Sequence, residues 1–357
     1  MTGEVREGED LYRRRALVLP LLAIFLGVIL AGCTVQQPPK EPKKREEAAA
    51  EETAKHLEGV WPEQPIEFIV PWSAGGGSDI MARAITRAIK SHNLAPVPVV
   101  VVNKPGGNAQ IGEAHVINRK GDPYTWMTLS SGQISIPLAG LGNIKATEFT
   151  PLAQMAADTL FLVVSEDSRF KTIEDVVQAA KADPGRLKIG GSGAGTEDHV
   201  VTYFFERAAG IKLNYVSFHG GSEVMSNLRG GDIDLAWANP NECLKELEDR
   251  LVRALAVTTE ERLESARGVP TFREEGYDVV FWMVRGVLGP PAMPQEAVEG
   301  SIEILRNVAG GDYWQKNYLE ARMLTPRFIP GDEYTRVIKE NEEMFREALK
   351  AMGMLEE

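Results

Sequence analysis

The chain contains little cysteine and histidine, and this scarcity limits the chemistry that it can support. Its 357 residues include two cysteines and five histidines. No C-x-x-C motif occurs, and no two histidines stand one helical turn apart, so the common zinc-binding patterns are missing. We therefore expect neither a metal site nor a bound cofactor.

The motifs of several enzyme classes are missing as well. No G-x-x-x-x-G-K-[ST] string occurs, so an ATP-binding P-loop is not supported. The glycines at 191, 193 and 195 do not have the G-x-G-x-x-G spacing of a dinucleotide-binding fold. Ser192 lacks the final glycine of a G-x-S-x-G nucleophile elbow. We therefore expect no catalytic residues.

Positive charge is in deficit over the whole chain. Lysine and arginine number 39 against 51 aspartates and glutamates, and the formal net charge is −12. This balance argues against a nucleic-acid partner. It does not exclude a small anionic ligand, because a local cluster of backbone N–H groups can outweigh the diffuse field of the chain.

The N-terminus has the pattern of an export signal. Arg13–Arg15 precede an apolar run over residues 16–30, which is short for a membrane span of roughly 20 residues. The string Leu30-Ala31-Gly32-Cys33 follows and resembles a bacterial lipoprotein signal. We expect residues 1–32 to be a signal peptide and Cys33 to be lipidated. An uncleaved membrane anchor is the alternative.

A linker is expected next, over residues 33–60. This segment is rich in proline, charge and alanine and has few large apolar side chains, so it cannot bury enough surface to fold. If Cys33 carries lipid, Cys243 has no partner for an intramolecular disulfide. We interpret Cys243 as a small core residue.

From residue 61 onward, short apolar strands alternate with helical segments, which predicts an α/β fold with mostly parallel sheets flanked by helices. Helices are expected over residues 172–182, 197–209 and 331–352, the first opened by Thr172 and Asp175 as a capping box. The expected strands are 66–70, 98–102, 125–129, 160–164, 187–190, 213–218, 233–237, 252–257 and 279–289.

The stretch VPWSAGGGSDIMAR at residues 70–83 is the most informative segment. An apolar strand runs into Gly75–Gly77, Ser78 and Asp79 are good helix caps, and an apolar-periodic segment begins at Ile80. Strand, glycine loop and helix start form a concave cluster of N–H groups that suits an anion. The alternative is a tight strand-to-helix turn with an ordinary cap.

A second glycine loop, residues 190–196, repeats this arrangement before the helix at Glu197. Ligands of open α/β sheets bind beyond the carboxyl ends of the strands. Two such loops facing each other across a cleft would hold a small anion from both sides. His199 and His219 lie near these turns, and either a ligand contact or an ordinary surface position fits them.

Longer strings resemble the extracytoplasmic solute receptors of tripartite tricarboxylate transporters, also called Bug receptors. They are WPEQPIEFIVPWSAGGGSDIMAR, VVVNKPGGNAQIG, GDPYTWMTLSSG, KIGGSGAGTEDH, HGGSEVMSNLRGGDIDL, RALAVTTEERL and EEGYDVVFWMVRGVLGPPAMP. The resemblance implies a two-domain periplasmic-binding-protein-like fold of type II. Domain one would be residues 61–164 with 280–330 and domain two residues 165–279. The C-terminal helix, residues 331–357, would pack on domain one.

The resemblance also implies a ligand site in the cleft between the domains. Asp79 would either cap its helix or face an ammonium group. The sequence departs from the commoner family strings at Phe218-His219-Gly220 and Trp237-Ala238-Asn239, so the resemblance does not imply which carboxylate is bound. The implied ligand-binding residues are Trp72, Ala74, Gly75, Gly76, Ser78, Asp79, Ser131, Ser192, Gly193, Thr196, His219 and Asn239.

The function implied is that of a lipid-anchored, monomeric receptor in the periplasm or on the outer face of the cell membrane. It would capture a small organic carboxylate, which could be a di- or tricarboxylate, an amino acid or an aromatic acid. It would then deliver this ligand to the large and small membrane subunits of the transporter. Two alternatives stay open at this point. They are a ligand sensor for a signalling membrane protein and an α/β enzyme that uses the same anion-binding loops.

Overall fold

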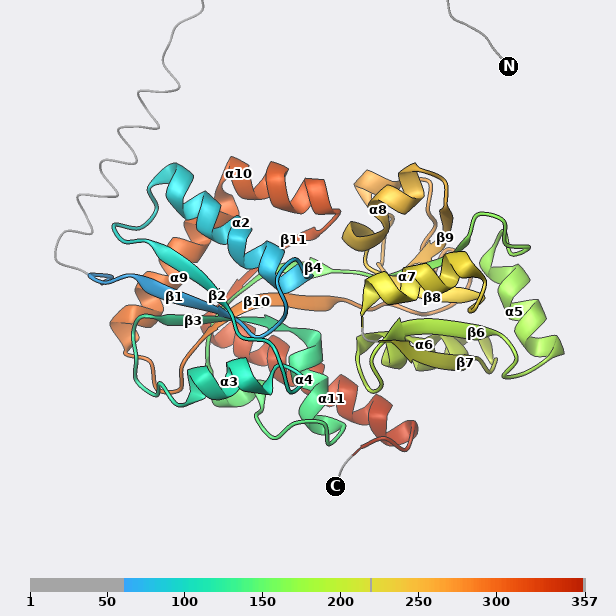
Figure 1. Ribbon diagram of the computed structural model, residues 1–357, viewed down its shortest axis with the longest axis horizontal. Coiled ribbons are helices and arrows are strands. Elements are labelled where there is room, and N and C mark those ends of the chain that lie inside the picture. Colours follow the sequence, from blue (N-terminus) through green and yellow to red (C-terminus); the bar gives the residue numbers. More distant parts are fainter. Residues whose placement is uncertain (1–60, 219, 356–357) are drawn as a thin grey trace, which may run out of the picture. The chain divides into compact units, whose positions relative to one another are not determined.

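The computed structural model describes residues 61–218 and 220–355, which belong to one compact unit, Arg45–Glu357 (Figure 1). The predicted signal peptide, the linker, Cys33 and His219 lie outside the described residues. Within these ranges, no helix combines the length and the apolar character that a bilayer-spanning segment needs.

The first sheet has six strands in the order β11-β4-β10-β3-β1-β2. Strand β1 pairs in parallel with β2 and β3, whereas β10 runs antiparallel to β3 and β4. The strands are β1 (Ile66–Val70), β2 (Val99–Asn103), β3 (Thr125–Ser130), β4 (Thr150–Asp158), β10 (Met283–Gly289) and β11 (Thr325–Pro330). The associated helices are α2 (Gly77–His92), α3 (Gln110–Ile117), α4 (Ser131–Leu138), α9 (Gln295–Gly310), α10 (Asp312–Trp314) and α11 (Gly331–Ala351).

The second sheet has five strands in the order β7-β6-β8-β5-β9. Its strands are β5 (Phe161–Ser165), β6 (Lys188–Ser192), β7 (Asn214–Phe218), β8 (Leu235–Ala238) and β9 (Val252–Val257). Its helices are α5 (Ile173–Ala182), α6 (Glu197–Ala209), α7 (Gly221–Gly230) and α8 (Pro240–Glu248). Short helical turns complete the chain at η1 (Ala146–Glu148), η2 (Glu264–Ala266), η3 (Gln315–Leu319, a π-helix) and η4 (Glu320–Arg322).

The α/β class with flanking helices is confirmed, and both sheets are mixed. Four strands of each sheet run in one direction, whereas β10 and β11 in the first sheet and β5 in the second run against them. After β4 the chain leaves the first sheet and enters the second as β5, and it returns as β10. Both of these strands lie antiparallel to their neighbours. The predicted domain boundaries remain predictions, although β5 pairs entirely within the second sheet.

Strands β4 and β11 were missed by the sequence reasoning. The sequence of β4, TPLAQMAAD, is rich in small residues and lacks the β-branched alternation that marks a strand. Strand β11 contains two prolines, which suits its place at the edge of the sheet. β4 forms because it pairs with β10, and β10 lies too far along the chain to be recognised from the residues around β4.

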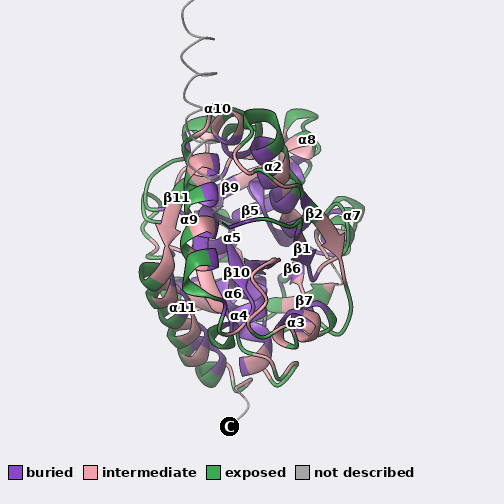
Figure 2. Ribbon diagram, turned by 90° about the vertical axis from the view of Figure 1, so that its left-hand side faces the viewer, coloured by how far each residue is buried: buried purple, intermediate pink, exposed green. Residues whose placement is uncertain are grey.

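Hydrophobic clusters cover both faces of the sheets, and Figure 2 shows the strands as mostly buried beneath helices with exposed outer faces. One cluster contains side chains of α2, α9 and Trp314 on one face of the first sheet. Another runs continuously from α4 and α11 to α5 and α6 of the second sheet. The two sheets therefore share part of one core.

The C-terminal helix α11 contacts elements associated with both sheets. It packs on α4 and β4 and also reaches α6. Tyr334 of α11 is fully buried against Gly286, where a Cβ would collide with the phenol. At its far end, Leu349 lies near Gly195 in the second glycine loop, 3.7 Å from the position of an added Cβ.

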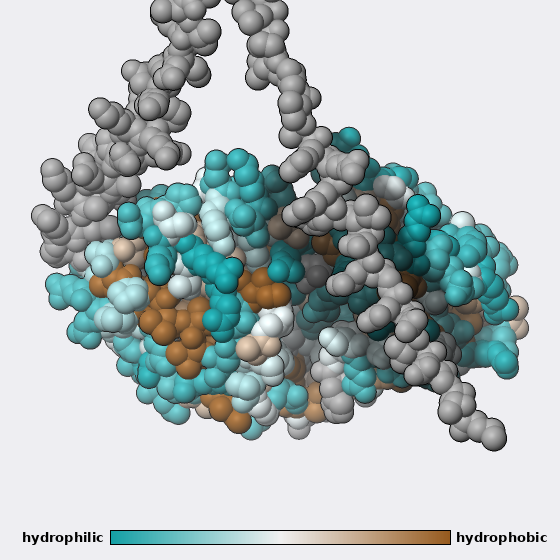
Figure 3. Space-filling model, turned by 45° about the horizontal axis from the view of Figure 1, so that its top comes forward, coloured by the Kyte–Doolittle hydropathy of each residue, from teal (hydrophilic) through white to brown (hydrophobic). Residues whose placement is uncertain are grey.

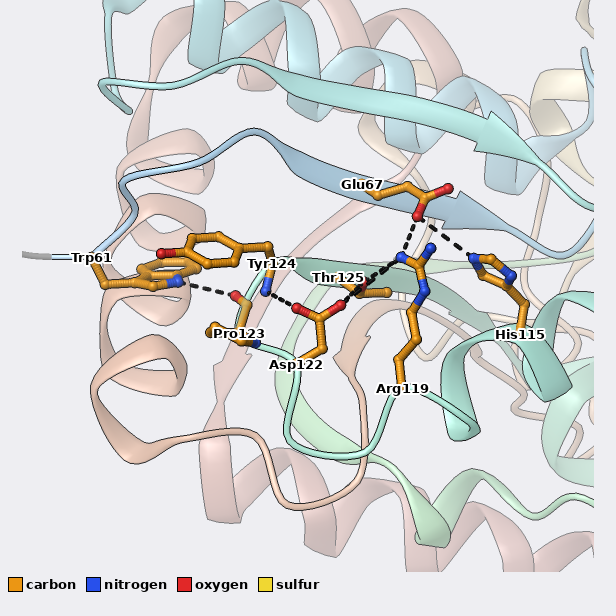
Figure 4. Close-up of polar contacts among 8 residues, drawn as sticks. All are labelled: Trp61, Glu67, His115, Arg119, Asp122, Pro123, Tyr124 and Thr125. Atoms are coloured by element: carbon orange, nitrogen blue, oxygen red, sulfur yellow. Dashed lines mark hydrogen bonds and ion pairs between the residues drawn. The ribbon is translucent and has the colours of Figure 1, made fainter.

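The start of the described chain is fastened to the first sheet (Figure 4). The Trp61 indole N–H donates to the carbonyl of Pro123 at 3.0 Å, and its ring stacks on Tyr124 with centroids 6.3 Å apart. Beside it, the carboxylate of Glu67 on β1 pairs with Arg119. Trp61 is therefore held against the first sheet.

Exposed hydrophobic side chains are few on the described surface. The large ones are Val100, Ile111, Leu141 and Leu251. Figure 3 shows hydrophobic side chains gathered on the part of the surface that belongs to the first sheet, with hydrophilic residues around them.

Candidate ligand-binding site

A cavity of about 1000 Å³ is lined by residues from both sheets. Its wall includes residues 72–78 with the first glycine loop, which follow β1, and residues 192–194 and 196 of the second glycine loop, at the end of β6. Residues at the ends of β3 and β8 complete this side of the wall. The structure thus brings the two loops to one cavity at the carboxyl ends of strands, where open α/β sheets bind ligands.

The first glycine loop is held in shape by Asp79 in the first turn of α2. Gly75 has a φ of +86°, a conformation that suits glycine. The Asp79 carboxylate accepts hydrogen bonds from the Gly75 N–H, Arg83 Nε and Asn103 Nδ2, each at 2.9 Å. Although desolvation opposes them, these bonds lower the pKa of Asp79. Asp79 is buried and fastens the loop. The expectation that Ser78 and Asp79 cap the helix was wrong, because α2 begins at Gly77 and its N-cap, Gly76, has no side-chain cap hydrogen bond.

The second glycine loop repeats this construction with Asp198 in the first turn of α6. The Asp198 carboxylate accepts from the Ser192 N–H at 2.7 Å and from Ser192 Oγ at 2.8 Å. Gly193 has a φ of +77°, and its carbonyl accepts from the Tyr215 hydroxyl at 2.8 Å. Desolvation and the neighbouring Glu197 raise the pKa of Asp198 to about 7. The sequence reasoning did not assign this role to Asp198.

Arg285 on β10 is a buried cation in the cavity wall that the sequence reasoning missed. It is 6 % exposed, and its Nε and Nη2 donate to Asp158 Oδ2 at 3.1 and 2.6 Å. Although desolvation opposes it, the Asp158 carboxylate raises the pKa of Arg285, which stays a cation. The guanidinium lies against Gly77 at the start of α2, where an added Cβ would stand 2.9 Å from Nη2. A charged residue inside the apolar string MVRGVLG was the available signal.

Glu197 and Glu242 also line the cavity. Glu197 at the start of α6 is half-buried and reaches towards α4, where a Cβ on Gly132 would lie 3.3 Å from its Oε2. Glu242 on α8 is exposed to the cavity and lies against Gly221 at the start of α7. Desolvation by the walls raises the pKa of both carboxyls, and the positive charge of Arg285 opposes this rise.

Comparison with known proteins decides the family. The sequence profile described as tripartite tricarboxylate transporter family receptor matches residues 81–353. The chain belongs to this receptor family. The predicted resemblance is therefore confirmed, and the protein is an extracytoplasmic solute-binding receptor with a two-domain periplasmic-binding fold.

Relatives of the receptor support this assignment. A Pseudomonas sp. (strain P51) protein, described as the UPF0065 protein in the tcbD-tcbE intergenic region, is 30% identical over 262 residues, covering 71% of this chain and 76% of its own. A TctC solute-binding protein from Polaromonas has a TM-score of 0.69 at 27% identity, over 82% of this chain and all (100%) of its own. An R. palustris protein solved with adipate has a TM-score of 0.74 at 24% identity, over 82% of this chain and 98% of its own, and shows the shared fold.

Most of the predicted binding residues of the receptor line the cavity. Asp79 does not, because its carboxylate is turned into the loop. Ser131 is buried beneath the wall, where its Oγ accepts from the Val284 N–H at 2.8 Å, while Gly132 next to it faces the cavity. Those that line it are Trp72, Ala74, Gly75, Gly76, Ser78, Ser192, Gly193, Thr196 and Asn239, and their contact with a ligand stays a prediction.

Two further residues of the receptor are placed by the structure. The His199 ring stacks on Tyr215 with centroids 4.0 Å apart, and its Nδ1 accepts from the Gly195 N–H at 3.3 Å. It therefore supports the second glycine loop. Cys243 is fully buried, and burial raises the pKa of its thiol to about 12, which agrees with its interpretation as a core residue.

Proposed function

We propose that this receptor captures a small organic carboxylate in the cavity and delivers it to the large and small membrane subunits of a tripartite tricarboxylate transporter. One observation carries the proposal. The N-terminal ends of α2 and α6, each preceded by a glycine loop, open onto one cavity from the two sheets. Each helix end favours an anion by about 0.3–1 kcal/mol when exposed. The adipate bound to the R. palustris relative agrees with this class of ligand.

Closure of the two sheets around the ligand would be a hinge motion. The connections between β4 and β5 and between β9 and β10 are where the chain passes from one sheet to the other. A ligand that touches both glycine loops binds the closed form better than the open one, so it shifts the population towards closure.

We propose a receptor without catalytic activity. Ser192 Oγ donates to Asp198 and has no histidine partner within the described residues. Ser78, also in the wall, has no such partner either among residues 61–218 and 220–355. A nucleophilic serine needs a base within hydrogen-bonding reach. Turnover of a bound carboxylate by the purified protein would contradict this part of the proposal.

We further propose that the receptor is monomeric and is attached to a membrane through lipid on Cys33. The sequence around Cys33 supports the attachment. Detergent phase partitioning of the wild-type receptor and of Cys33→Ser tests it. The wild type should enter the detergent phase and the variant should stay in the aqueous phase. Partitioning of both into the detergent phase would favour an uncleaved anchor.

The ligand is tested by native mass spectrometry of the receptor as purified, followed by a thermal-shift screen. The screen contains dicarboxylates, tricarboxylates, aromatic acids and amino acids. We expect at least one of these carboxylates to raise the melting temperature. If none does, and none co-purifies, the proposal is wrong. A neighbouring gene pair for large and small multi-spanning proteins would favour transport over sensing.

A further inference from the structure

We infer that the ligand carries a cationic group as well as a carboxylate, with Arg285 binding the carboxylate and Glu197 and Glu242 binding the cation. An amino acid has this chemistry. The inference rests on the proposed function, since it assumes that the cavity binds a small carboxylate. It narrows the ligand from all organic acids to those that bear an ammonium group.

The first step concerns the open edge of Arg285. Its Nε and Nη2 are taken by Asp158, but Nη1 makes no hydrogen bond with residues 61–218 or 220–355. The residue is 6 % exposed and lines the cavity. Nη1 is not one of the buried polar atoms that lack a partner, so it is accessible from the cavity and free to donate to an acceptor that a ligand supplies. A carboxylate suits a guanidinium, because it can accept two parallel N–H bonds.

The position of Arg285 beneath Gly77 strengthens this assignment. The start of α2 carries the positive end of the helix dipole, and the guanidinium lies directly against it. Two positive centres in contact favour an anion at the point that both can reach. Asp158 neutralises the guanidinium from the buried side, so the side facing the cavity remains for a ligand.

The second step concerns the carboxylates that face Arg285. Neither Glu197 nor Glu242 forms an ion pair within the described part of the chain, and Glu197 accepts only from its own backbone N–H. The positive charge of Arg285 acts on both carboxylates, but Arg285 forms its ion pair with Asp158 and not with either of them. Asp198, the next acid of the wall, is already occupied by Ser192.

A ligand with carboxylates alone would meet repulsion from Glu197 and Glu242, and desolvation on closure would strengthen it. An ammonium group would receive attraction from the same two side chains. The arginines of the wall other than Arg285 are Arg229 and Arg322. The acids Glu197, Asp198, Glu242 and Glu246 line the same wall, so the cavity as a whole does not favour a polyanion.

The experiment is calorimetric titration of the full-length receptor with matched pairs of probes. Each pair differs by one aliphatic amino group, which is an ammonium cation at neutral pH: aspartate against succinate, glutamate against glutarate, and phenylalanine against 3-phenylpropionate. We expect the aminated member of at least one pair to bind tenfold or more tightly than its partner. Glu197→Gln and Glu242→Gln should each weaken that member by about tenfold and leave its partner unchanged or tighter. Glu248→Gln, on α8 but outside the cavity wall, is the control.

Arg285→Lys keeps the positive charge but loses the planar fork, and it should weaken both members of a pair equally. Thermal melts confirm that each variant is folded. Binding of the carboxylates with no preference for an amino group overturns this inference alone and leaves the proposed function standing. The same holds if both glutamine variants keep the wild-type preference. Failure of every probe to bind overturns the inference, and it overturns the proposed function as well if the thermal-shift screen and native mass spectrometry also find no carboxylate.

Discussion

The buried ion pair between Arg285 and Asp158 makes the stability of the receptor depend on two side chains from different strands. Asp158 on β4 is fully buried and Arg285 on β10 is 6 % exposed. We consider Arg285→Met, Asp158→Asn and the double variant. Removing one partner leaves an uncompensated charge in the interior, which typically costs about 3–5 kcal/mol. Replacing both removes the charge altogether and typically costs much less.

A thermal melt measures these changes. For a domain of this size 1 kcal/mol corresponds to roughly 2–4 °C, so Arg285→Met should lower the melting temperature by about 6–20 °C. The double variant should recover a large part of this loss. Arg262→Met is the control, because Arg262 and Glu274 form an exposed pair with side chains 42% and 46% accessible. That change should cost at most about 1 kcal/mol.

Two results would refute the reasoning. One is a loss for Arg285→Met no larger than that for Arg262→Met. The other is strict additivity, in which the double variant loses the sum of the two single losses. Additivity within about 0.5 kcal/mol is what independent sites give, and these two side chains share hydrogen bonds of 2.6 and 3.1 Å.

Three further predictions follow from single positions. Gly193→Ala in the second glycine loop and its control Gly185→Ala both place a side chain at a φ of +77°, so each should lower the stability by about 1–2 kcal/mol. In thermal-shift assays Gly193→Ala and Gly76→Val should each abolish stabilisation by ligand, whereas Gly185→Ala should not. Ligand stabilisation retained in both loop variants would contradict the two-loop site. Burial raises the pKa of Glu113 from 4.5 to about 7, so its carboxyl is protonated more readily when folded, and stability should fall as pH rises from about 4.5 to 7, by up to about 3 kcal/mol. Melts from pH 4 to pH 8 should show a shallower fall for Glu113→Gln, and equal slopes would refute the assignment. The buried Tyr334 hydroxyl has no partner within the described residues, so Tyr334→Phe should leave the melting temperature unchanged or higher, whereas a clear fall would reveal a hydrogen bond.

Local signals in the sequence predicted much of the fold. Strands β1 and β9 have the predicted bounds, and Thr172 and Asp175 form the predicted capping box at α5. These features depend on neighbours within a few residues. Strand β4 depends instead on β10, which lies far along the chain, and its small side chains do not reveal it. The mixed sheets follow from the same crossings between the two halves of the fold.

The candidate site shows the same division. The two glycine loops were predictable, because glycine, strand and cap stand together in sequence. Arg285 was not, since its partner Asp158 and its neighbour Gly77 come from distant segments. Glu242 likewise reaches the cavity from α8. Glu197 was recognised only as the start of a helix. The surroundings of such a carboxylate come from the opposite wall of the cavity, which is formed by segments distant in sequence.

The C-terminal helix connects the two sheets of the receptor outside the cavity, because it contacts elements associated with both. Helix α11 is packed on α4 and β4 at one end of its path and touches α6 and Gly195 farther on. A hinge motion that separates the two sheets would therefore either break the contacts between α11 and α6 or move the second glycine loop together with α11. If the proposed hinge closure occurs, we expect the last turns of α11 to limit its amplitude, and removing them should loosen a loop some 150 residues earlier in the sequence.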